Sequence, residues 1–289
     1  MRGYWLFPLF AMSLAGPEAR AQEYLRESTL YRLDAGSSFQ RGCLDPAYCD
    51  VPAPVPLSGT FVLTPTQKDF DLDAYEMSEV HWQDGSGGGL LLLGGGSYWV
   101  RSPFSVFRVI MAHLGGTVPE ARFEGRADGA GTFSRLDITM SASLGPYDDA
   151  RIVLIASPVP DTEIRWFRVH ASSTYKRGVC NSASVDSRAL TGTFGLLELH
   201  PGLADLEVVS VRWRALSRDS TDPSDLFLSD FGTLAGRDMS LILSEDSRRP
   251  ILLDGHADLS PDGLRLEAVL SSAGGCVLRT VTLSAKRIP

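Results

Sequence analysis

The sequence predicts an all-β protein built from two tandem homologous antiparallel domains, each of them a β-sandwich or a β-barrel. Two observations carry this prediction. The chain repeats itself at about half its length, and its apolar residues alternate with polar ones at period two, the period of a half-buried strand. No helical period runs convincingly for twelve residues. With 289 residues, the chain is long for one domain and sufficient for two.

The repeat begins with a short phrase, LSGTF at 57–61, that returns as LTGTF at 190–194. Further blocks match in the same order, at offsets that shrink from 136 to about 129. A copied domain that lost loop residues at several turns predicts this decrease, whereas unrelated strands with a shared β vocabulary would scatter the offsets. The further matching pairs are 31–42 with 167–178, 75–82 with 206–213, 123–128 with 253–258, 135–137 with 265–267, and 151–160 with 279–289.

Within these blocks, alternate residues predict which face of each strand is buried. Gly, Pro, Asp and Ser separate the segments every ten to fifteen residues, which is typical of short antiparallel strands. Seven to nine strands are expected in each copy. The predicted inward residues are Leu57, Gly59, Phe61 and Leu63, repeated by Leu190, Gly192, Phe194 and Leu196, together with Leu136, Ile138 and Met140, repeated by Leu266, Ala268 and Leu270.

These matches set the expected domain boundaries. An N-terminal lead at 22–29 precedes a first β domain at 30–160, and a second, its internal repeat, occupies 166–289. The linker at 161–165 is so short that the two domains should pack closely rather than tumble freely.

Residues 1–21 read as a secretory signal peptide. Arg2 gives a positive start, an apolar run covers 4–15, and Ala19-Arg20-Ala21 forms a small-residue cleavage site. A membrane anchor is the alternative, but the apolar run is shorter than the roughly 20 residues that a span requires. We therefore expect a secreted, periplasmic or cell-envelope bacterial protein with no transmembrane segment after cleavage.

The charge balance narrows the class of partner. The formal net charge is −8, and removal of the signal peptide makes it −9. An acidic surface repels phosphate backbones, so nucleic-acid binding is disfavoured. A carbohydrate, lipid or protein ligand is compatible with this charge, and no motif calls for a cofactor.

Four cysteines remain in the mature chain, an even number that suggests disulfides in an exported protein. Four cysteines allow three connectivities. Cys43 and Cys49 share one loop of the first copy, Cys180 begins the equivalent loop of the second, and Cys276 opens its last strand. We predict the bonds Cys43–Cys49 and Cys180–Cys276, one inside each domain, with free thiols as the alternative.

The opening YRLDAGSSFQRGC at 31–43, followed by Pro46, Cys49 and LSGTF, resembles a group of exported bacterial hypothetical proteins with no assigned function. The resemblance covers most of the first copy and, more weakly, the second. It implies export and a β-rich fold but no activity. Members of the group carry further cysteines where this chain has Ala47 and Tyr147, which implies that the relative of Cys180–Cys276 is missing from the first copy.

No catalytic or metal-binding motif is found. The chain has no G-x-S-x-G elbow and no H-E-x-x-H, and its histidines are too far apart in sequence to indicate a zinc site. Alternating acids at 69–76 match a calcium loop only in part, because Ala74 replaces the turn glycine and Val80 the bidentate Glu, so a strand with an acidic face is favoured. The five histidines are His81, His113, His170, His200 and His256.

The run at 87–96, GGGLLLLGGG, lacks the Gly-Lys-Ser/Thr of a phosphate loop. It is expected to be a buried strand whose leucines are covered. We therefore predict no catalytic, cofactor or metal residues.

The resulting hypothesis is an exported non-catalytic module with a binding or structural role. The alternative is a hydrolase whose carboxylates lie between the two copies, Asp128 and Asp258 being the candidates. Those acids, and the pairs Arg135/Arg265 and Asp137/Glu267, are polar in both copies, which turn chemistry and cross-strand ion pairs also explain.

Overall fold

The computed structural model describes residues 28–45, 49–68, 72–84, 90–101, 104–113, 121–128, 134–146, 148–179, 185–199, 205–216, 225–245, 251–263, 265–272 and 277–289. The predicted signal peptide, Cys180 and Cys276 lie outside these residues. Within the described part of the chain, no helix is long and apolar enough to cross a membrane.

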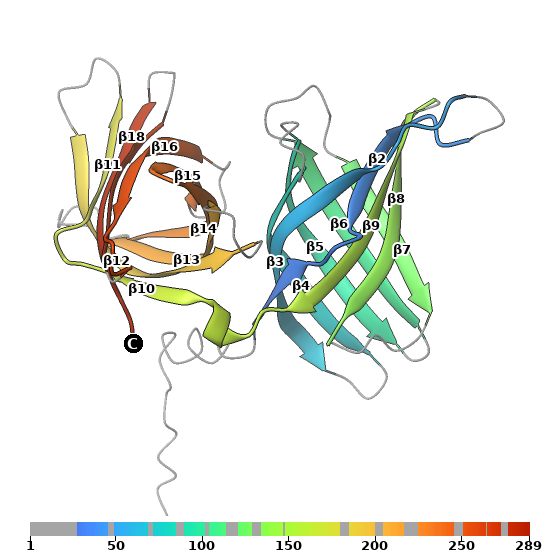
Figure 1. Cartoon of the computed structure of the whole chain (residues 1–289), viewed down its shortest axis with the longest axis horizontal. Coiled ribbons are helices and arrows are strands. Elements are labelled where there is room, and N and C mark those ends of the chain that lie inside the picture. Colours follow the sequence, from blue (N-terminus) through green and yellow to red (C-terminus); the bar gives the residue numbers. More distant parts are fainter. Residues whose placement is uncertain are drawn as a thin grey trace, which may run out of the picture.

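Two antiparallel sheets make up the molecule (Figure 1). The strands of the first are β1 (Thr29–Leu33), β2 (Ser38–Gly42), β3 (Val55–Lys68), β4 (Asp73–Asp84), β5 (Leu91–Arg101), β6 (Phe104–His113), β7 (Ala121–Asp128), β8 (Leu136–Gly145) and β9 (Asp148–Pro158). Those of the second are β10 (Arg165–Val169), β11 (Thr174–Val179), β12 (Val185–Glu198), β13 (Asp205–Leu216), β14 (Leu226–Ala235), β15 (Asp238–Glu245), β16 (Ile251–Leu259), β17 (Arg265–Ser271) and β18 (Val277–Arg287). A short 3-10 helix, η1 (Asp161–Glu163), connects the two sheets.

Each sheet closes on itself. In the first, β3 pairs with β4, consecutive strands pair as far as β9, and β1 returns from β9 to β3. Because β1 and β2 share one position, the ring has eight strand positions, and β10 to β18 repeat it in the same order. The predicted all-β class and the two tandem antiparallel domains are confirmed. Of the two architectures that the sequence left open, the pairings select the barrel.

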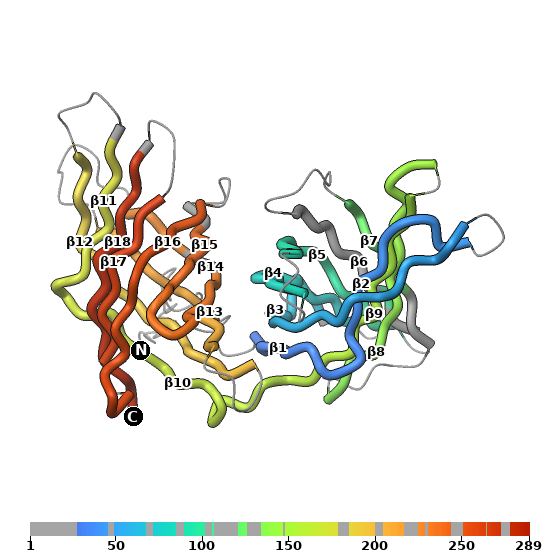
Figure 2. The backbone as a smooth tube through the Cα atoms, turned by 45° about the horizontal axis from the view of Figure 1, so that its top comes forward, coloured from blue at the N-terminus to red at the C-terminus, as the bar shows by residue number. Residues whose placement is uncertain are grey.

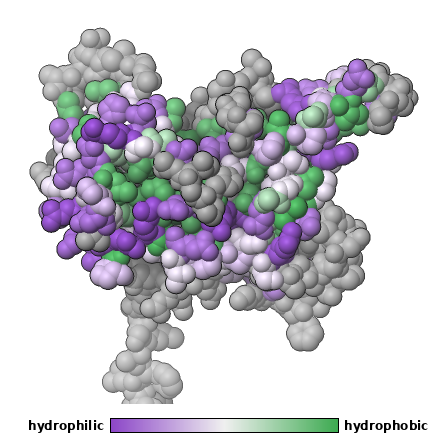
Figure 3. Space-filling view, in the orientation of Figure 1, coloured by the Kyte–Doolittle hydropathy of each residue, from purple (hydrophilic) through white to green (hydrophobic). Residues whose placement is uncertain are grey.

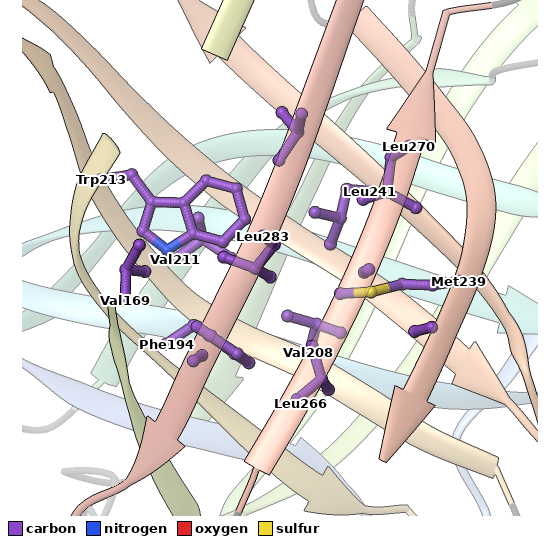
Figure 4. Packing of buried hydrophobic residues seen from close by; sticks show 14 of the residues in the cluster. Val169, Phe194, Val208, Val211, Trp213, Met239, Leu241, Leu266, Leu270 and Leu283 are labelled. Atoms are coloured by element: carbon purple, nitrogen blue, oxygen red, sulfur yellow. The ribbon is translucent and has the colours of Figure 1, made fainter. Parts of the chain in front are cut away.

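Both barrels are filled by the alternate residues that the period-two pattern predicted to be inward. Phe61 and Phe194 are fully buried, and Leu136, Ile138 and Met140 are at most 2% exposed. In the first barrel Tyr31 stacks on Phe61 with ring centroids 5.3 Å apart, and Trp82 meets Phe61 edge-on at 5.9 Å. Figure 4 shows the second core, where Val169, Phe194, Trp213 and Leu283 converge from different strands. Such filled interiors are typical of small barrels.

In each barrel a glycine allows two neighbouring strands to approach closely, β3 and β4 in the first and β12 and β13 in the second. Gly59 pairs with Trp82, and Gly192 pairs with Trp213. Their φ angles are 133° and 134°, and a Cβ on either would lie 1.9 Å from a backbone oxygen of the neighbouring strand. Only glycine fits such a position. The shared glycine and strand order are what a duplication requires, and the duplication itself stays a prediction.

Figure 2 shows the two barrels side by side, with the chain passing from β9 through η1 into β10 along one edge of the junction. Arg165, which sequence reasoning assigned to the linker, begins β10 and pairs with Leu196. In the space-filling view, polar residues are spread over the visible face of both barrels, with smaller apolar patches between them (Figure 3).

Candidate binding site at the junction of the barrels

The outer faces of β4 and β13 meet where the barrels touch. His81 points out of the first barrel, since its neighbour Trp82 points in, yet His81 is only 3% exposed. Glu207 on β13 is fully buried. Polar side chains on the outside of a barrel are ordinarily solvated, so their burial here results from contact with the other barrel.

Glu207 is held by two groups of the opposite barrel. Its Oε1 lies 2.8 Å from His81 Nδ1 and accepts a hydrogen bond of 2.8 Å from the Thr60 hydroxyl. Thr60 and His81 are direct partners in the β3–β4 ladder, so the two strands present both groups together. The His81 ring also stacks on Phe231 of β14, with centroids 4.5 Å apart. Glu207 Oε2 has no hydrogen-bond partner.

An ion pair also crosses the junction, between Glu79 and Arg212. The Glu79 side chain is 8% exposed and that of Arg212 is 33% exposed. Burial raises the pKa of the Glu79 carboxyl, and the Arg212 guanidinium, which lowers the pKa, offsets that effect only in part. Glu79 is thus the more deeply buried partner of this ion pair.

One member of each pair, His81 in the first barrel and Arg212 in the second, occupies a corresponding position. His81 lies opposite Thr60 and Arg212 lies opposite Thr193 in the same place in each ladder. Just before them, each strand has a bulge with one residue at positive φ, Glu79 at 53° and Ser210 at 51°. Bulges bend a strand and redirect its side chains, which here turn outward toward the other barrel.

Apolar contacts accompany the His81–Glu207 hydrogen bond and the Glu79–Arg212 ion pair. One cluster joins Leu93 of β5 to Phe231 and Ile242 of the second barrel. Leu93 belongs to the Gly-rich run, whose Leu92 and Leu93 are 4% and 6% exposed, so these two leucines are covered as expected. A larger cluster gathers at the connection between the barrels, and its members are Leu30, Val62, Val159, Ile164, Leu197 and Val209. We call this second set the linker cluster.

A cavity of about 720 Å³ opens beside the linker cluster. It is bordered by residues of both barrels and of η1, so neither barrel forms it alone. Its apolar lining consists of Leu30, Val62, Val159, Ile164 and Trp166. Its polar lining consists of Ser28, Thr29, Asp161, Thr193, Ser210 and Arg212. The volume lies within the roughly 300–1,000 Å³ of small-molecule sites, which also tend to lie between domains.

The junction contains two different environments, a buried hydrogen-bonded group and a cavity. His81, Glu207 and Thr60 are each at most 3% exposed, so this hydrogen-bonded group is closed to a reactant and ties the barrels together. Among its described lining residues, the cavity instead offers hydroxyl-bearing side chains, the guanidinium of Arg212, the carboxyl of Asp161 and the indole of Trp166 to a ligand. Among the described residues, no three His, Cys, Asp or Glu side chains gather as a metal site would require.

The acids named from sequence lie elsewhere. Asp258 is on β16, where it pairs with Arg237, and both side chains are at least 67% exposed. Asp128 ends β7 and pairs in the ladder with Phe104. Among the described residues, Glu79 and Glu207 are carboxylates of the junction, and Asp161 borders the cavity. A hydrolase built on Asp128 and Asp258 would therefore have to use other surfaces than the junction cavity.

Other sequence candidates have ordinary structural surroundings. Residues 69–71 of the acidic run lie outside the described residues, and the rest of it enters β4. His170 hydrogen-bonds Ser172, and His256 hydrogen-bonds Asp238 on an exposed hairpin. The predicted Cys43–Cys49 disulfide is confirmed, with Cα atoms 6.0 Å apart.

Sequence reasoning missed the junction residues. His81 was considered only as a metal ligand, and Glu207, Arg212 and Trp166 were not singled out. One signal was available, because the repeat aligns His81 with Arg212, directly before the shared Trp82 and Trp213. Nothing in the alternation itself distinguishes an outward residue in solvent from one covered by a second domain.

Comparisons with known proteins give remote structural similarities. No protein-family model and no curated protein matches the chain. Among solved structures, a proposed outer membrane protein from Bacteroides fragilis is 10% identical at a TM-score of 0.26, covering 91% of this chain and 99% of its own. A variant of transferrin binding protein B from Haemophilus parasuis is 8% identical at a TM-score of 0.27, covering 90% of this chain and 76% of its own. Transferrin binding protein B from Neisseria meningitidis is 9% identical at a TM-score of 0.23, with coverages of 91% and 77%. At these scores, the similarity carries no conclusion about the ligand of this chain.

Proposed function

We propose that this chain is exported and acts as a non-catalytic binding module, with its ligand held in the cavity at the junction of the two barrels. The cavity is the observation that carries the proposal. In the part of the chain that the structure describes, the inward side chains of each barrel pack into one apolar cluster, as in small filled barrels rather than hollow ones. The junction cavity is bordered by polar groups from both barrels and is large enough for a small ligand.

Two further features support the proposal. The Cys43–Cys49 disulfide suits an oxidising, exported environment. The Glu207 and Glu79 pairs hold the barrels against each other, so the cavity walls are preorganised and binding does not require the domains to be brought together.

Export is tested by expressing the full chain with a C-terminal tag in a bacterium and sequencing the N-terminus of the mature product. Cleavage before Gln22 and recovery from the periplasm or medium are expected. A product that keeps residues 1–21 in the cytoplasm would contradict export.

Binding is tested on the mature chain by the change in melting temperature with neutral oligosaccharides, acidic oligosaccharides, fatty acids and short peptides. Bound ligands stabilise the native state by mass action, so a true ligand raises the melting temperature with its concentration. Thr193→Trp, which places a bulky group in the cavity, should abolish the rise. Thr191→Trp, on the same outward face of β12, is the matched control. Equal responses of the two variants, or no response to any panel, would refute binding at the junction.

A further inference from the structure

We infer that the junction cavity binds a short neutral oligosaccharide. This inference rests on the proposed function, since it names the ligand class of the same cavity. Four properties of the lining support it. An indole ring is partly exposed to the cavity, and several lining residues carry hydroxyls. The lining has no unpaired cation among its described residues, and its aliphatic side chains are already buried against one another.

The indole comes from Trp166 on β10. Its ring is half-buried, packing on the linker cluster while also lining the cavity. Trp166 pairs with Gly195, and a Cβ on Gly195 would meet the Trp166 ring at 3.6 Å and Ile164 at 2.5 Å. The corresponding ladder pair in the first barrel is Leu30 with Val62. At this place the second barrel has a glycine with a large flat ring over it, where the first barrel has two aliphatic residues. A flat aromatic surface suits the C–H face of a sugar ring.

The polar rim can both donate and accept hydrogen bonds. Hydroxyl-bearing residues line the cavity from both barrels, Thr29 from the first, Thr193 and Ser210 from the second. Each hydroxyl supplies one donor and two acceptor lone pairs, whereas a carboxylate only accepts and a guanidinium only donates. Sugar hydroxyls likewise donate and accept, so they match a mixed rim of this kind better than a ligand with acceptors alone.

The charge of the lining favours a neutral ligand. Among the lining residues that the structure describes, the cation Arg212 is already paired with Glu79, and the acid Asp161 is exposed and adds a negative charge. An anion would have to compete with Glu79 for Arg212 while facing Asp161. Among the described lining residues, a cation would find the exposed carboxylate of Asp161 but also the guanidinium of Arg212. Neither sign of charge gains the close pairing that offsets desolvation.

The remaining apolar lining does not suit a long alkyl chain. Leu30, Val62, Val159 and Ile164 line the cavity, but each is at most 9% exposed because it is packed in the linker cluster. Hydrophobic binding scales with the apolar area removed from water, and these residues have little left to remove. Trp166 is the main apolar surface that a ligand can still cover.

The test titrates the mature chain by calorimetry with maltotriose, cellotriose, mannotriose and triacetylchitotriose. Trigalacturonate serves as the acidic counterpart and dodecanoate as the amphiphile. At least one neutral trisaccharide is expected to bind with a Kd below about 1 mM, and the two charged probes to bind at least tenfold more weakly.

Variants then locate the bound sugar. Trp166→Ala should weaken binding at least tenfold, and Thr193→Val, which removes only the hydroxyl, should weaken it severalfold. Trp166→Phe keeps an aromatic ring and should retain most of the affinity, which separates loss of stacking from loss of folding. Trp99→Ala, on β5 of the first barrel, is the matched control and should bind like the parent chain. Melting curves of each variant identify any that fail to fold.

The outcomes separate the inference from the proposed function. Neutral-sugar binding that falls with Trp166→Ala and is kept by Trp166→Phe supports both. Preferential binding of dodecanoate or trigalacturonate, lost in Thr193→Trp, overturns the sugar while leaving a binding module. Sugar binding that is indifferent to Trp166→Ala and Thr193→Val overturns the site. No binding of any probe up to about 10 mM overturns the sugar inference, and a simultaneous absence of response in all melting panels overturns the proposed function as well.

Discussion

Glu207 of the second barrel and His81 of the first are joined by a hydrogen bond of 2.8 Å, with neither side chain more than 3% exposed. The bond lies between two outer barrel surfaces, so it exists only because the domains are docked. Variants that remove this bond therefore report how much docking of the barrels contributes to the stability of the chain.

Glu207→Ala should destabilise the chain by about 3–5 kcal/mol, because it leaves His81 and Thr60 buried without their acceptor. Glu207→Gln keeps an acceptor oxygen and should cost less. Urea unfolding measures the change, and a double-mutant cycle with His81→Ala should give a coupling energy of about 1–3 kcal/mol.

Glu198→Ala is the control for this prediction. Its carboxylate pairs with Arg165, but the side chain is 54% exposed, and exposed pairs contribute at most about 1 kcal/mol. If Glu207→Ala unfolded at the same urea concentration as Glu198→Ala, the buried bond would have no role in stability.

Gly59→Ala and Gly192→Ala should each destabilise the fold by at least about 3 kcal/mol. The added Cβ would lie 1.9 Å from the carbonyl oxygen of His81 or Arg212, at a φ that L side chains rarely adopt. Because the two sites have the same surroundings, the two losses should be similar. Gly145→Ala has no heavy atom within 4 Å of its added Cβ and should change stability by less than about 0.5 kcal/mol. Chemical denaturation of the three variants checks this, and a Gly59→Ala chain as stable as Gly145→Ala would contradict it.

Alkaline unfolding should depend on Tyr31. Burial raises the pKa of Tyr31 to about 12, with smaller contributions from Tyr98 and Tyr75. An unfolded tyrosine ionises near pH 10, so the folded state alone holds the proton between pH 10 and about 12. The Tyr31 contribution to stability is therefore complete below pH 10 and is lost as the pH rises to about 12, with a slope approaching about 1.4 kcal/mol per pH unit.

Tyr31→Phe should remove that part of the pH dependence and leave the core packed. The second barrel already has Phe167 at the corresponding place, stacked on Phe194 at 5.3 Å just as Tyr31 stacks on Phe61. Urea midpoints measured from about pH 9 to about pH 12 test this. An unchanged slope in Tyr31→Phe would show that other groups govern alkaline unfolding.

Much of the fold could be predicted from the sequence because its signals are local. Period-two alternation identified the inward residues Leu57, Phe61 and Leu63 and their counterparts, since a strand with one buried face imposes that pattern on the chain. Barrel closure could not be predicted in this way. It depends on β1 meeting both β3 and β9, and such non-local pairing leaves no mark on the alternation of any single strand.

The candidate site was beyond the reach of the same reasoning. Trp166, Thr193 and Arg212 are brought together by the β10–β12 and β12–β13 pairings of the second barrel. They border a cavity only because Leu30 and Val62 of the first barrel face them across the junction. His81 and Glu207 are polar residues at outward positions, which normally indicates solvent. Their burial follows from the relative placement of the domains, which neither composition nor period encodes.

The second predicted disulfide can be tested by reduction and by peptide mapping. Cys180 and Cys276 lie outside the described residues, and we expect them to form a bond within the second domain. In the chain-entropy model, a bridge closing nearly a hundred residues contributes about 4.7 kcal/mol, whereas the short loop of Cys43–Cys49 contributes about 2.4 kcal/mol. Reduction of the Cys43→Ser, Cys49→Ser double variant should therefore still lower its urea midpoint markedly, and the Cys180→Ser, Cys276→Ser double variant should lose less on reduction. Peptide mapping without reductant should recover Cys180 linked to Cys276, and finding both as free thiols, or either joined to Cys43, would rule the bond out.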